Sequence, residues 1–262
     1  MARIVAISNQ KGGVGKTTTA INLGAALATH GQRVLLVDME PQGNASSGLG
    51  CPRTHATMGI YDVLMEFREL DSVRVPTSVD RMELIPATRD LAGAAIELSE
   101  ERHRDRRLRR ALNRVRDDYD WILVDCPPTL NLLTVNALVA ADGVLIPLQA
   151  EYYAMEGLGE LLRTVSAVRK SLNPDLEREG IVITMTDTRT NLCREVEAQA
   201  RHLFGEEVFE TVIPRNVRLG EAPSHGKAIV HYDPQSTGAR AHLALAAEMI
   251  ARRSPSRHEE AV

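Results

Sequence analysis

The sequence predicts an α/β fold with a doubly wound, mostly parallel sheet and helices on both faces. Short apolar runs alternate with helix-length segments along the 262 residues. Several of these runs show no polar alternation, which is typical of strands buried on both faces of a parallel sheet. A glycine-rich stretch, "KGGVGKTT", separates the first apolar run from the first helical segment.

The expected elements follow the chain in a β-α-β-α order, which implies a doubly wound sheet. Strands are predicted at 3–8, 33–38, 82–87, 121–125, 143–149, 180–184 and 208–213. Helices are predicted at 16–29, which Gly31 ends, and at 131–141, 153–172 and 237–252. No repeat or Pro/Gly/Ser-rich linker divides the chain. We therefore expect one domain over 1–252 and a flexible tail over 253–262.

The composition and the N-terminal residues exclude several classes of protein, among them disulfide-rich secreted proteins and membrane-spanning proteins. Three cysteines without close spacing indicate neither a disulfide framework nor a C-x-x-C metal site. The N-terminal "MARIVAIS" lacks the long apolar core of a signal peptide, and no apolar run is long enough to span a membrane. These features predict a cytoplasmic protein. The net charge of −4 predicts no overall attraction to nucleic acid, so DNA binding would need a local basic face.

The stretch at 9–18 nearly matches the phosphate-loop pattern G-x-x-x-x-G-K-[ST], with Gln10 in place of the first glycine. The glycines that follow let backbone N–H groups turn inward at a helix N-terminus, which makes an anion site. Lys16 can reach the β- and γ-phosphates, and the Thr17 hydroxyl can ligate Mg²⁺. A second lysine in the same loop, Lys11, has no role in that pattern.

A buried strand ending in a carboxylate is predicted from "WILVDCPP" at 121–128. Asp125 would lie at the same sheet edge as the phosphate loop, where it could hold a water on magnesium. Taken alone, such a residue could equally cap a turn. Together with the loop, it indicates a nucleotide and magnesium site.

The chain resembles the deviant Walker A ATPases, and among them the ParA/Soj chromosome and plasmid partitioning proteins. The resemblance rests on "KGGVGKTT", "VDMEPQGNASSGLG", "VDCPP", "QAEYYAMEGL", "TMTDTRTNL" and "IPRNVRLGEAPSHGK", which follow one another in the family's order. It implies that Lys11 crosses a dimer interface to the nucleotide of the partner subunit. The implied nucleotide contacts are Lys11, Gly12, Gly13, Val14, Gly15, Lys16, Thr17, Thr18, Met185, Pro214 and Asn216.

The resemblance implies ATP and Mg²⁺ as ligands and catalytic roles for Lys11, Lys16 and Glu40. The family usually has Asp-x-Asp where this chain has Asp38, Met39 and Glu40. The second acid lies beside the magnesium and the attacking water in the family, so Glu40 keeps the charge on a longer arm. Core packing is an equal alternative for Met185.

Two arginines, Arg189 and Arg218, match positions that the family uses for DNA, and Lys227 is a weaker candidate. Their contacts would be directed to phosphates and independent of sequence. A denser cluster lies in "ERHRDRRLRRALNRVR" at 101–116. Apolar residues at helical spacing within it, Leu108, Ala111, Leu112 and Val115, predict a buried stripe, so most of its arginines are expected on a solvated face.

The implied function is a switch in DNA partitioning: ATP closes a homodimer on non-specific double-stranded DNA at the nucleoid, and a ParB-like adaptor stimulates slow hydrolysis. A MinD-like membrane ATPase is an alternative, but "RRSPSRHEEAV" has no apolar face for a membrane helix. Another ParA-like cargo-positioning ATPase is a further alternative. A nitrogenase iron protein would need cluster cysteines, and a DNA-binding regulator would need a reading element before the loop; neither feature is found.

Overall fold

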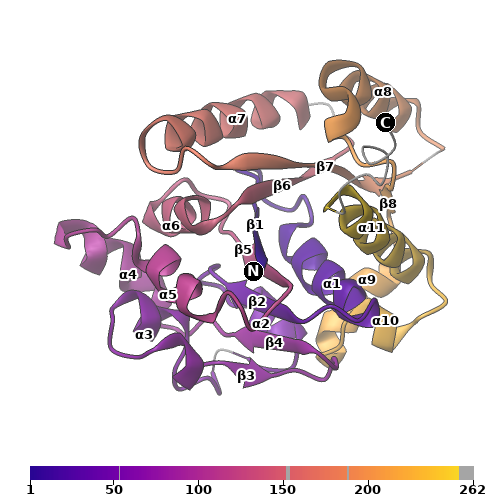
Figure 1. The fold of residues 1–262 in the computed structure, drawn as a ribbon. Helices are drawn as coiled ribbons and strands as arrows, with labels where there is room; N and C mark the ends of the chain where they lie inside the picture. The colour runs from indigo at the N-terminus through magenta and orange to yellow at the C-terminus, as the bar shows by residue number, and fades with distance from the viewer. Residues whose placement is uncertain (53, 152–153, 188, 254–262) are drawn as a thin grey trace, which may run out of the picture.

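The computed structural model describes residues 1–52, 54–151, 154–187 and 189–253 (Figure 1). The strands are β1 (Arg3–Ile7), β2 (Val34–Asp38), β3 (Val75–Pro76), β4 (Met82–Ile85), β5 (Trp121–Asp125), β6 (Gly143–Gln149), β7 (Glu177–Thr186) and β8 (Ile213–Pro214). The helices are α1 (Lys16–Thr29), α2 (Asn44–Gly48), α3 (Ile60–Leu64), α4 (Leu91–Glu97), α5 (Arg107–Val115), α6 (Leu132–Ala140), α7 (Ala154–Ser171), α8 (Asn191–Phe204), α9 (Val217–Glu221), α10 (Ile229–Tyr232) and α11 (Thr237–Arg253).

These strands form one sheet of eight in the order β3-β4-β2-β5-β1-β6-β7-β8. All neighbouring pairs are parallel except β3 with β4, which is antiparallel. The first strand lies near the middle, with β5, β2, β4 and β3 on one side of it and β6, β7 and β8 on the other. This is the doubly wound arrangement that the sequence predicted, and it places a crevice at the carboxyl ends of the central strands.

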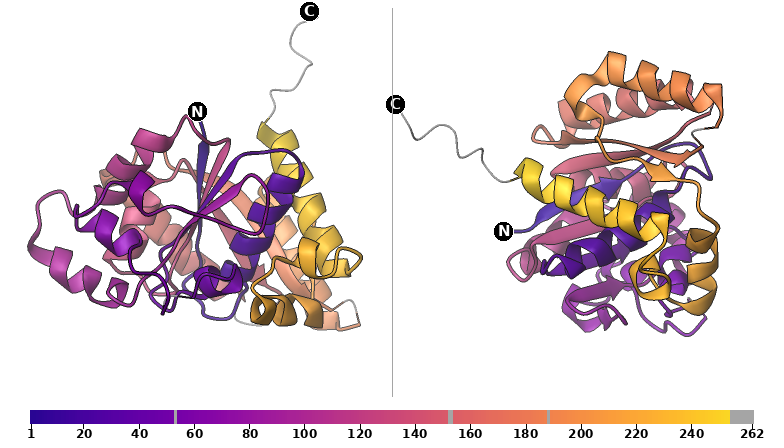
Figure 2. Two further views of the ribbon diagram at one scale, coloured as in Figure 1. Left: turned by 90° about the horizontal axis from the view of Figure 1, so that it is seen from below. Right: turned by 90° about the vertical axis from the view of Figure 1, so that its right-hand side faces the viewer.

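Helices cover both faces of the sheet, and each face has its own hydrophobic core (Figures 1 and 2). Alternate residues of β1 point to opposite faces: Ile4 and Ala6 join the core under α3 to α8, whereas Val5 and Ile7 join the core under α1 and α11. Because successive side chains of a strand point to opposite sides, a strand covered on both faces must be apolar throughout. The unbroken apolar runs of the sequence have this cause.

One predicted strand, 208–213, is wrong. Within it, Val208 forms only an isolated bridge with Ile181, and the strand β8 begins at Ile213. The Glu248 carboxylate on α11 accepts the backbone N–H groups of Glu210 and Thr211, each at 2.9 Å. A side chain from a distant helix therefore takes the hydrogen bonds that a sheet neighbour would have taken.

The other differences concern elements that were not predicted and the end of the chain. The two-residue strand β3 and the short helices α2, α3, α9 and α10 had no sequence prediction, because they span too few residues to show a period. The helices α4 and α8 were also missed, although α8 spans 14 residues. The predicted helix at 237–252 extends to Arg253. The rest of the predicted tail, 254–262, lies outside the described residues.

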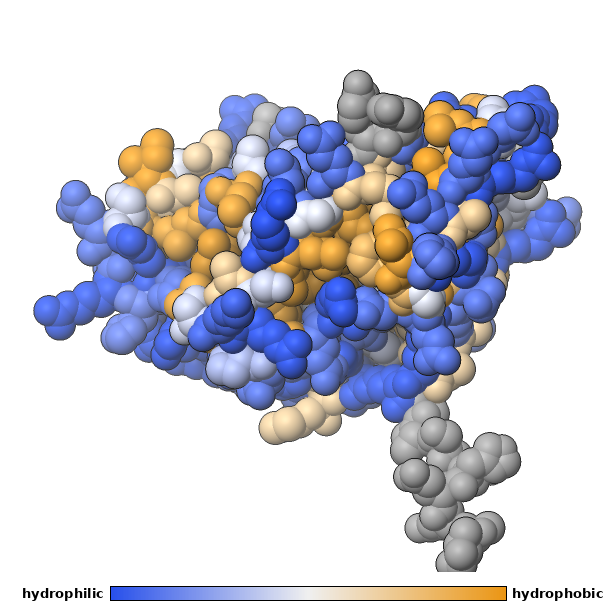
Figure 3. All heavy atoms as spheres, turned by 90° about the horizontal axis from the view of Figure 1, so that it is seen from above, coloured by the Kyte–Doolittle hydropathy of each residue, from blue (hydrophilic) through white to orange (hydrophobic). Residues whose placement is uncertain are grey.

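The face that carries α7 and α8 is uneven in polarity. Figure 3 shows apolar side chains gathered in a band across the middle of this face, with charged side chains around it. Part of it is an open hollow on α7, lined by Gly159, Leu162 and Ala167 among others. No helix in the described ranges is long and apolar enough to cross a lipid bilayer.

Gly180 lies in β7 at a φ of 148°, where a Cβ would sit 2.5 Å from the Phe209 ring and 2.8 Å from the Glu207 carbonyl oxygen. Because the site combines backbone strain with overpacking, we expect Gly180→Ala to lower the free energy of unfolding by about 2 to 4 kcal/mol. The matched control is Gly157→Ala in α7, where nothing lies within 4 Å of the new Cβ. That change should stabilise by about 0.5 to 1 kcal/mol. Urea unfolding of both variants checks this; equal midpoints would contradict the strain at Gly180.

Candidate functional site

The phosphate loop connects the end of β1 to the start of α1. Gly13 and Gly15 have φ values of 76° and 90°, and Gly15 is the N-cap residue of α1. The Thr184 hydroxyl donates to the Val14 carbonyl at 2.9 Å, and the Asn9 amide donates to the Pro147 carbonyl at 2.8 Å. The neighbouring strands β6 and β7 thus fix the loop before any anion binds.

Lys16 lies inside this loop with 7% of its surface exposed. Its ammonium donates to the Lys11 carbonyl at 3.0 Å. Burial lowers the pKa of Lys16, while the nearby Asp125 carboxyl opposes that change. The loop therefore has a cation at its centre, in the position where the sequence predicted phosphate contacts.

Two buried carboxylates lie side by side next to the loop. Asp38 ends β2 and Asp125 ends β5, and the two residues are Cα partners in the parallel register. Both side chains are fully buried. Asp38 accepts hydrogen bonds from the Ser46 hydroxyl at 2.6 Å and the Ser46 backbone N–H at 2.8 Å. Burial raises the pKa of Asp38 in spite of these bonds.

Asp125, in contrast, lacks the well-formed hydrogen bonds that Asp38 makes, within the part of the chain that the structure describes. Among the described residues, neither of its carboxylate oxygens has a hydrogen-bond partner of normal geometry, although Thr17 is close enough to lower its pKa. Burial first, and the Asp38 charge second, raise the pKa of Asp125 well above its usual range. A buried carboxylate without donors favours a cation. The site therefore fits magnesium held by Thr17 and, through water, by Asp125.

Lys11 has a different surrounding from Lys16. Its ammonium lies 2.7 Å from a Glu151 carboxylate oxygen, and its side chain is one-third exposed. Gln149 donates to the other oxygen of Glu151. The second lysine of the loop thus points along the molecular surface toward the end of β6, away from the site that Lys16 occupies.

A cavity of about 370 Å³ lies over the loop. Its lining residues are Gly12, Gly13, Gly15, Lys16, Thr17, Thr18, Glu40, Gln42, Asn44, Pro128 and Met185. The Glu40 carboxylate accepts the Gln42 backbone N–H at 3.1 Å, which holds it at the rim of this cavity. The cavity contains the Lys16 side chain and lies at a helix N-terminus, so it suits phosphate groups.

A second cavity of about 220 Å³ adjoins the first, and both are lined by Gly15, Thr18 and Met185. Its further lining residues are Thr19, Thr184, Ile213, Pro214, Arg215, Asn216, Leu219, Gly220 and His242. Met185 has a φ of 53°, which is uncommon outside glycine. Pro214, Asn216 and Met185, predicted near adenine, are thus brought together in one pocket beside the phosphate cavity.

The predicted DNA-binding residues follow two adjacent strands. Arg189 comes after β7 and Arg218 lies on α9 after β8; the Arg215 N–H joins the two strands by donating to the Thr186 carbonyl at 3.0 Å. Arg189 is 87% exposed and pairs with Asp187 at 2.7 Å. This ion pair lowers the pKa of Asp187 to about 2.

Arg218 is 54% exposed and lies 2.8 Å from Glu221 and 3.5 Å from Asp233. Lys227 is exposed just before α10. Each of the two predicted DNA-binding arginines is therefore held by a carboxylate of the same chain.

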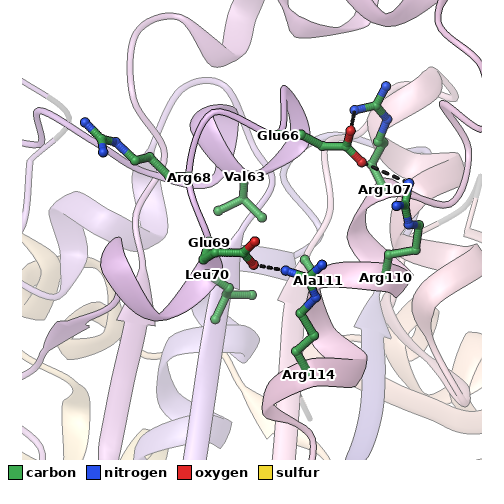
Figure 4. Close-up of a pocket in the computed structure, with 9 residues that line it drawn as sticks. All are labelled: Val63, Glu66, Arg68, Glu69, Leu70, Arg107, Arg110, Ala111 and Arg114. Atoms are coloured by element: carbon green, nitrogen blue, oxygen red, sulfur yellow. Dashed lines mark hydrogen bonds and ion pairs between the residues drawn. The ribbon is translucent and has the colours of Figure 1, made fainter.

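Three arginines of the 101–116 cluster, Arg107, Arg110 and Arg114, line a pocket (Figure 4) that shares no lining residue with the two cavities beside the phosphate loop. Of the predicted apolar stripe, Leu108, Leu112 and Val115 are buried, whereas Ala111 is only partly buried and lines the pocket. The pocket has a volume of about 230 Å³ and lies beside α5. Its arginines pair with glutamates: Arg107 with Glu66 and Glu101, Arg110 with Glu66, and Arg114 with Glu69. Much of the positive charge of this helix is thus balanced within the chain.

Sequence reasoning missed several neighbours of the site. Asp38 and Ser46 form a buried pair beside Asp125, and Glu151 holds Lys11. The sequence could have predicted that Asp38 lies beside Asp125, because "RVLLVD" and "WILVD" both end in an aspartate and parallel strands end at the same edge of a sheet. No sequence pattern marks Glu151 or Arg215 as part of the site, since an acidic residue after a strand and an arginine in a loop are common on protein surfaces.

Comparison with known proteins agrees with this geometry. A family model described as an AAA domain matches residues 2–178. The sporulation initiation inhibitor protein Soj of Bacillus subtilis is 55% identical over 251 residues, which cover 96% of this chain and 99% of Soj. The chromosome partitioning protein ParA of Myxococcus xanthus is 52% identical over 255 residues, 97% of this chain and 90% of that protein.

A solved structure has the same fold. It is that of cobyrinic acid a,c-diamide synthase from Mycobacterium smegmatis with a bound ATP analogue and magnesium, with a TM-score of 0.86 and 37% identity over 98% of each chain. The phosphate loop, the paired strand-end carboxylates and the full-length similarity to Soj and ParA lead to one conclusion. The chain belongs to the ParA/Soj family of chromosome-partitioning ATPases.

Proposed function

We propose that this protein is an ATP-dependent switch that partitions chromosomal or plasmid DNA. The observation that carries the proposal is the pair of lysines in one loop. Lys16 lines the phosphate cavity, whereas Lys11 does not line it and reaches the surface. A cation placed outside its own site can serve the nucleotide of a second copy, so the γ-phosphate of ATP would control dimerisation.

In this proposal ATP spans the two adjoining cavities, with phosphates over the loop and adenine beside Pro214 and Asn216. Thr17 and Asp125 would hold magnesium, which supplies positive charge to the phosphates when it is bound. The loop N–H groups and Lys16 orient the phosphates and neutralise their charge. The shared residues Gly15, Thr18 and Met185 fix the relation between base and phosphates.

Glu40 would orient the water that attacks the γ-phosphorus. Its carboxylate lies at the rim of the phosphate cavity, fixed by the Gln42 N–H. Phosphoryl transfer needs mainly orientation and charge stabilisation from the protein, and an arm one methylene longer than aspartate orients water less well. Slow hydrolysis suits a timed switch, in which ATP closes the dimer and hydrolysis opens it.

The closed dimer would bind double-stranded DNA without sequence preference through Arg189 and Arg218, with Lys227 as a further contact, and so associate with the nucleoid in the cytoplasm. A ParB-like adaptor would stimulate hydrolysis. The 52% to 55% identity to partitioning proteins supports this assignment over that of the diamide synthase, which is 37% identical.

The first prediction concerns Lys11. ATP with Mg²⁺ should convert the monomer to a dimer, and ADP should not, because only the γ-phosphate gives Lys11 a partner across the interface. Lys11→Ala should stay monomeric in ATP. Light scattering measures the mass, and Lys170→Ala, at an exposed lysine near the end of α7, is the control. A dimeric Lys11→Ala would remove this role.

The second prediction concerns DNA. The ATP-bound wild type should bind duplex DNA of any sequence, with affinity falling steeply as salt rises, since neutralised phosphates release counterions. Arg189→Ala and Arg218→Ala should bind weakly and still hydrolyse ATP. Each lost contact should reduce the salt slope by about 1. Arg114→Ala, from the paired cluster on α5, is the comparison; weaker binding only in that variant would move the DNA face to α5.

The third prediction concerns Glu40. Aspartate would draw the carboxylate back by roughly 1 to 1.5 Å, and displacement on that scale can change a rate by about 10²-fold. We expect Glu40→Asp to raise turnover several-fold and Glu40→Ala nearly to abolish it, with ATP affinity and dimerisation little changed in both. Single-turnover phosphate release is the measurement. Equal rates in wild type and Glu40→Asp would show that the loop adjusts to the longer arm.

A further inference from the structure

The phosphate loop carries a side chain where its sequence pattern has a glycine. Gln10 occupies the first position of G-x-x-x-x-G-K-[ST], and the two cavities beside the loop are lined by other residues. The Gln10 Nε2 donates to the Thr164 Oγ1 at 3.0 Å. Thr164 lies within α7, so this hydrogen bond joins residues 154 positions apart. The residue that departs from the pattern therefore ties the loop to α7.

Helix α7 is a firm support for this hydrogen bond. Four of its apolar side chains are buried in the core on that face of the sheet: Leu158, Leu161, Val165 and Val168. The Thr164 hydroxyl also donates to the Glu160 carbonyl at 3.2 Å. Because a hydroxyl has one proton and two lone pairs, it can donate to Glu160 and accept from Gln10 at the same time.

The main chain on either side of Gln10 is held as well. Asn9 is 2% exposed, and its amide nitrogen donates to the Pro147 carbonyl at 2.8 Å. The Asn9 oxygen accepts the Lys11 N–H at 3.0 Å. The Lys11 carbonyl accepts the Lys16 ammonium at 3.0 Å. Both polar groups of the Lys11 main chain are thus bonded, and Gln10 fixes the residue before it.

The Lys11 side chain is held less firmly than its main chain. Its ammonium pairs with Glu151 at 2.7 Å, but the lysine side chain is one-third exposed and the glutamate nearly half exposed. Exposed ion pairs of this kind are weak, because solvent screens them and both side chains lose freedom. The ammonium can therefore exchange Glu151 for another anion while the loop keeps the Lys11 Cα in place.

We propose that Gln10 is a positioning residue: its hydrogen bond to Thr164 fixes the loop so that Lys11 points out of its own phosphate cavity toward the nucleotide of a second copy. The inference rests on the proposed function, in which Lys11 contacts the partner subunit's nucleotide. A segment fixed in its bound conformation loses less freedom on association than a free one. A glycine at this position would remove the anchoring side chain and add backbone freedom.

The experiment measures dimerisation and nucleotide binding separately. The dimer dissociation constant of Gln10→Ala is measured by analytical ultracentrifugation with Mg²⁺ and ATPγS, a slowly hydrolysed analogue of ATP. We expect it to rise roughly threefold to tenfold for each of the two lysines that must be ordered, about tenfold to a hundredfold in all. Gln10→Gly should weaken the dimer further. Affinity for ADP, measured by calorimetry, should stay at the wild-type value, because Gln10 lies outside the cavity linings.

A second variant removes the other partner of the hydrogen bond. Thr164→Val should weaken the dimer as much as Gln10→Ala does. The double variant should be no weaker than either single variant, because both changes remove the same hydrogen bond. Thr164→Ser keeps the hydroxyl and should dimerise as the wild type does. The matched control is Ser166→Ala, at an exposed hydroxyl on the same helix.

The outcomes separate this inference from the proposed function. Wild-type dimerisation in both single variants would overturn the inference. So would a loss of ADP affinity and of the urea unfolding midpoint in parallel with the loss of dimer, since that is the result for a residue that only supports the fold. Either single variant decides the test if the other does not fold. A wild type that stays monomeric with ATPγS and with ATP would overturn the proposed function as well.

Discussion

The burial of two carboxylates at one sheet edge is the constraint on which the site depends. Asp38 and Asp125 are adjacent in the parallel register of β2 and β5, and both are fully buried. Two such groups without a cation are costly, since burial and mutual repulsion both disfavour ionisation. Ser46 satisfies Asp38, and Lys16 is the nearby positive charge. Among the described residues, the carboxylate oxygens of Asp125 have no hydrogen-bond partner, and the proposed function places magnesium beside them.

Three of the cations assigned to external anions share a second feature, because each of them has a carboxylate partner within this chain. Lys11 pairs with Glu151, Arg189 with Asp187, and Arg218 with Glu221. Exposed pairs of this kind contribute little to stability, about 0 to 1 kcal/mol. In the proposed switch, a phosphate of the partner subunit's nucleotide or of DNA replaces the carboxylate that each cation contacts in the monomer. Because these ion pairs are weak, breaking them lowers the stability of the monomer only slightly.

The smaller cavity lies between the phosphate loop and the elements that carry Arg189 and Arg218. Its walls come from the ends of β7 and β8, from α9 and from α11. Arg189 follows β7, and Arg218 lies on α9, which follows β8. The Arg215 N–H bonds the Thr186 carbonyl and ties the two loops together. A nucleotide in the cavity would therefore contact the elements that position the proposed DNA face.

The sequence by itself determined the parallel sheet, α1 and the phosphate loop, because apolar runs, helical periods and "KGGVGKTT" act over a few adjacent residues. It also placed Asp125 correctly at the loop's side of the sheet. Only the tertiary structure decided that Glu248 takes the hydrogen bonds of 210–211, that Glu151 holds Lys11, and that residues of β7, β8, α9 and α11 line one cavity beside the phosphate loop. These contacts join residues far apart in the chain, so no local pattern records them. They exist because α11 packs against the sheet and because β6 lies next to β1 within it, which brings Glu151 close to the phosphate loop.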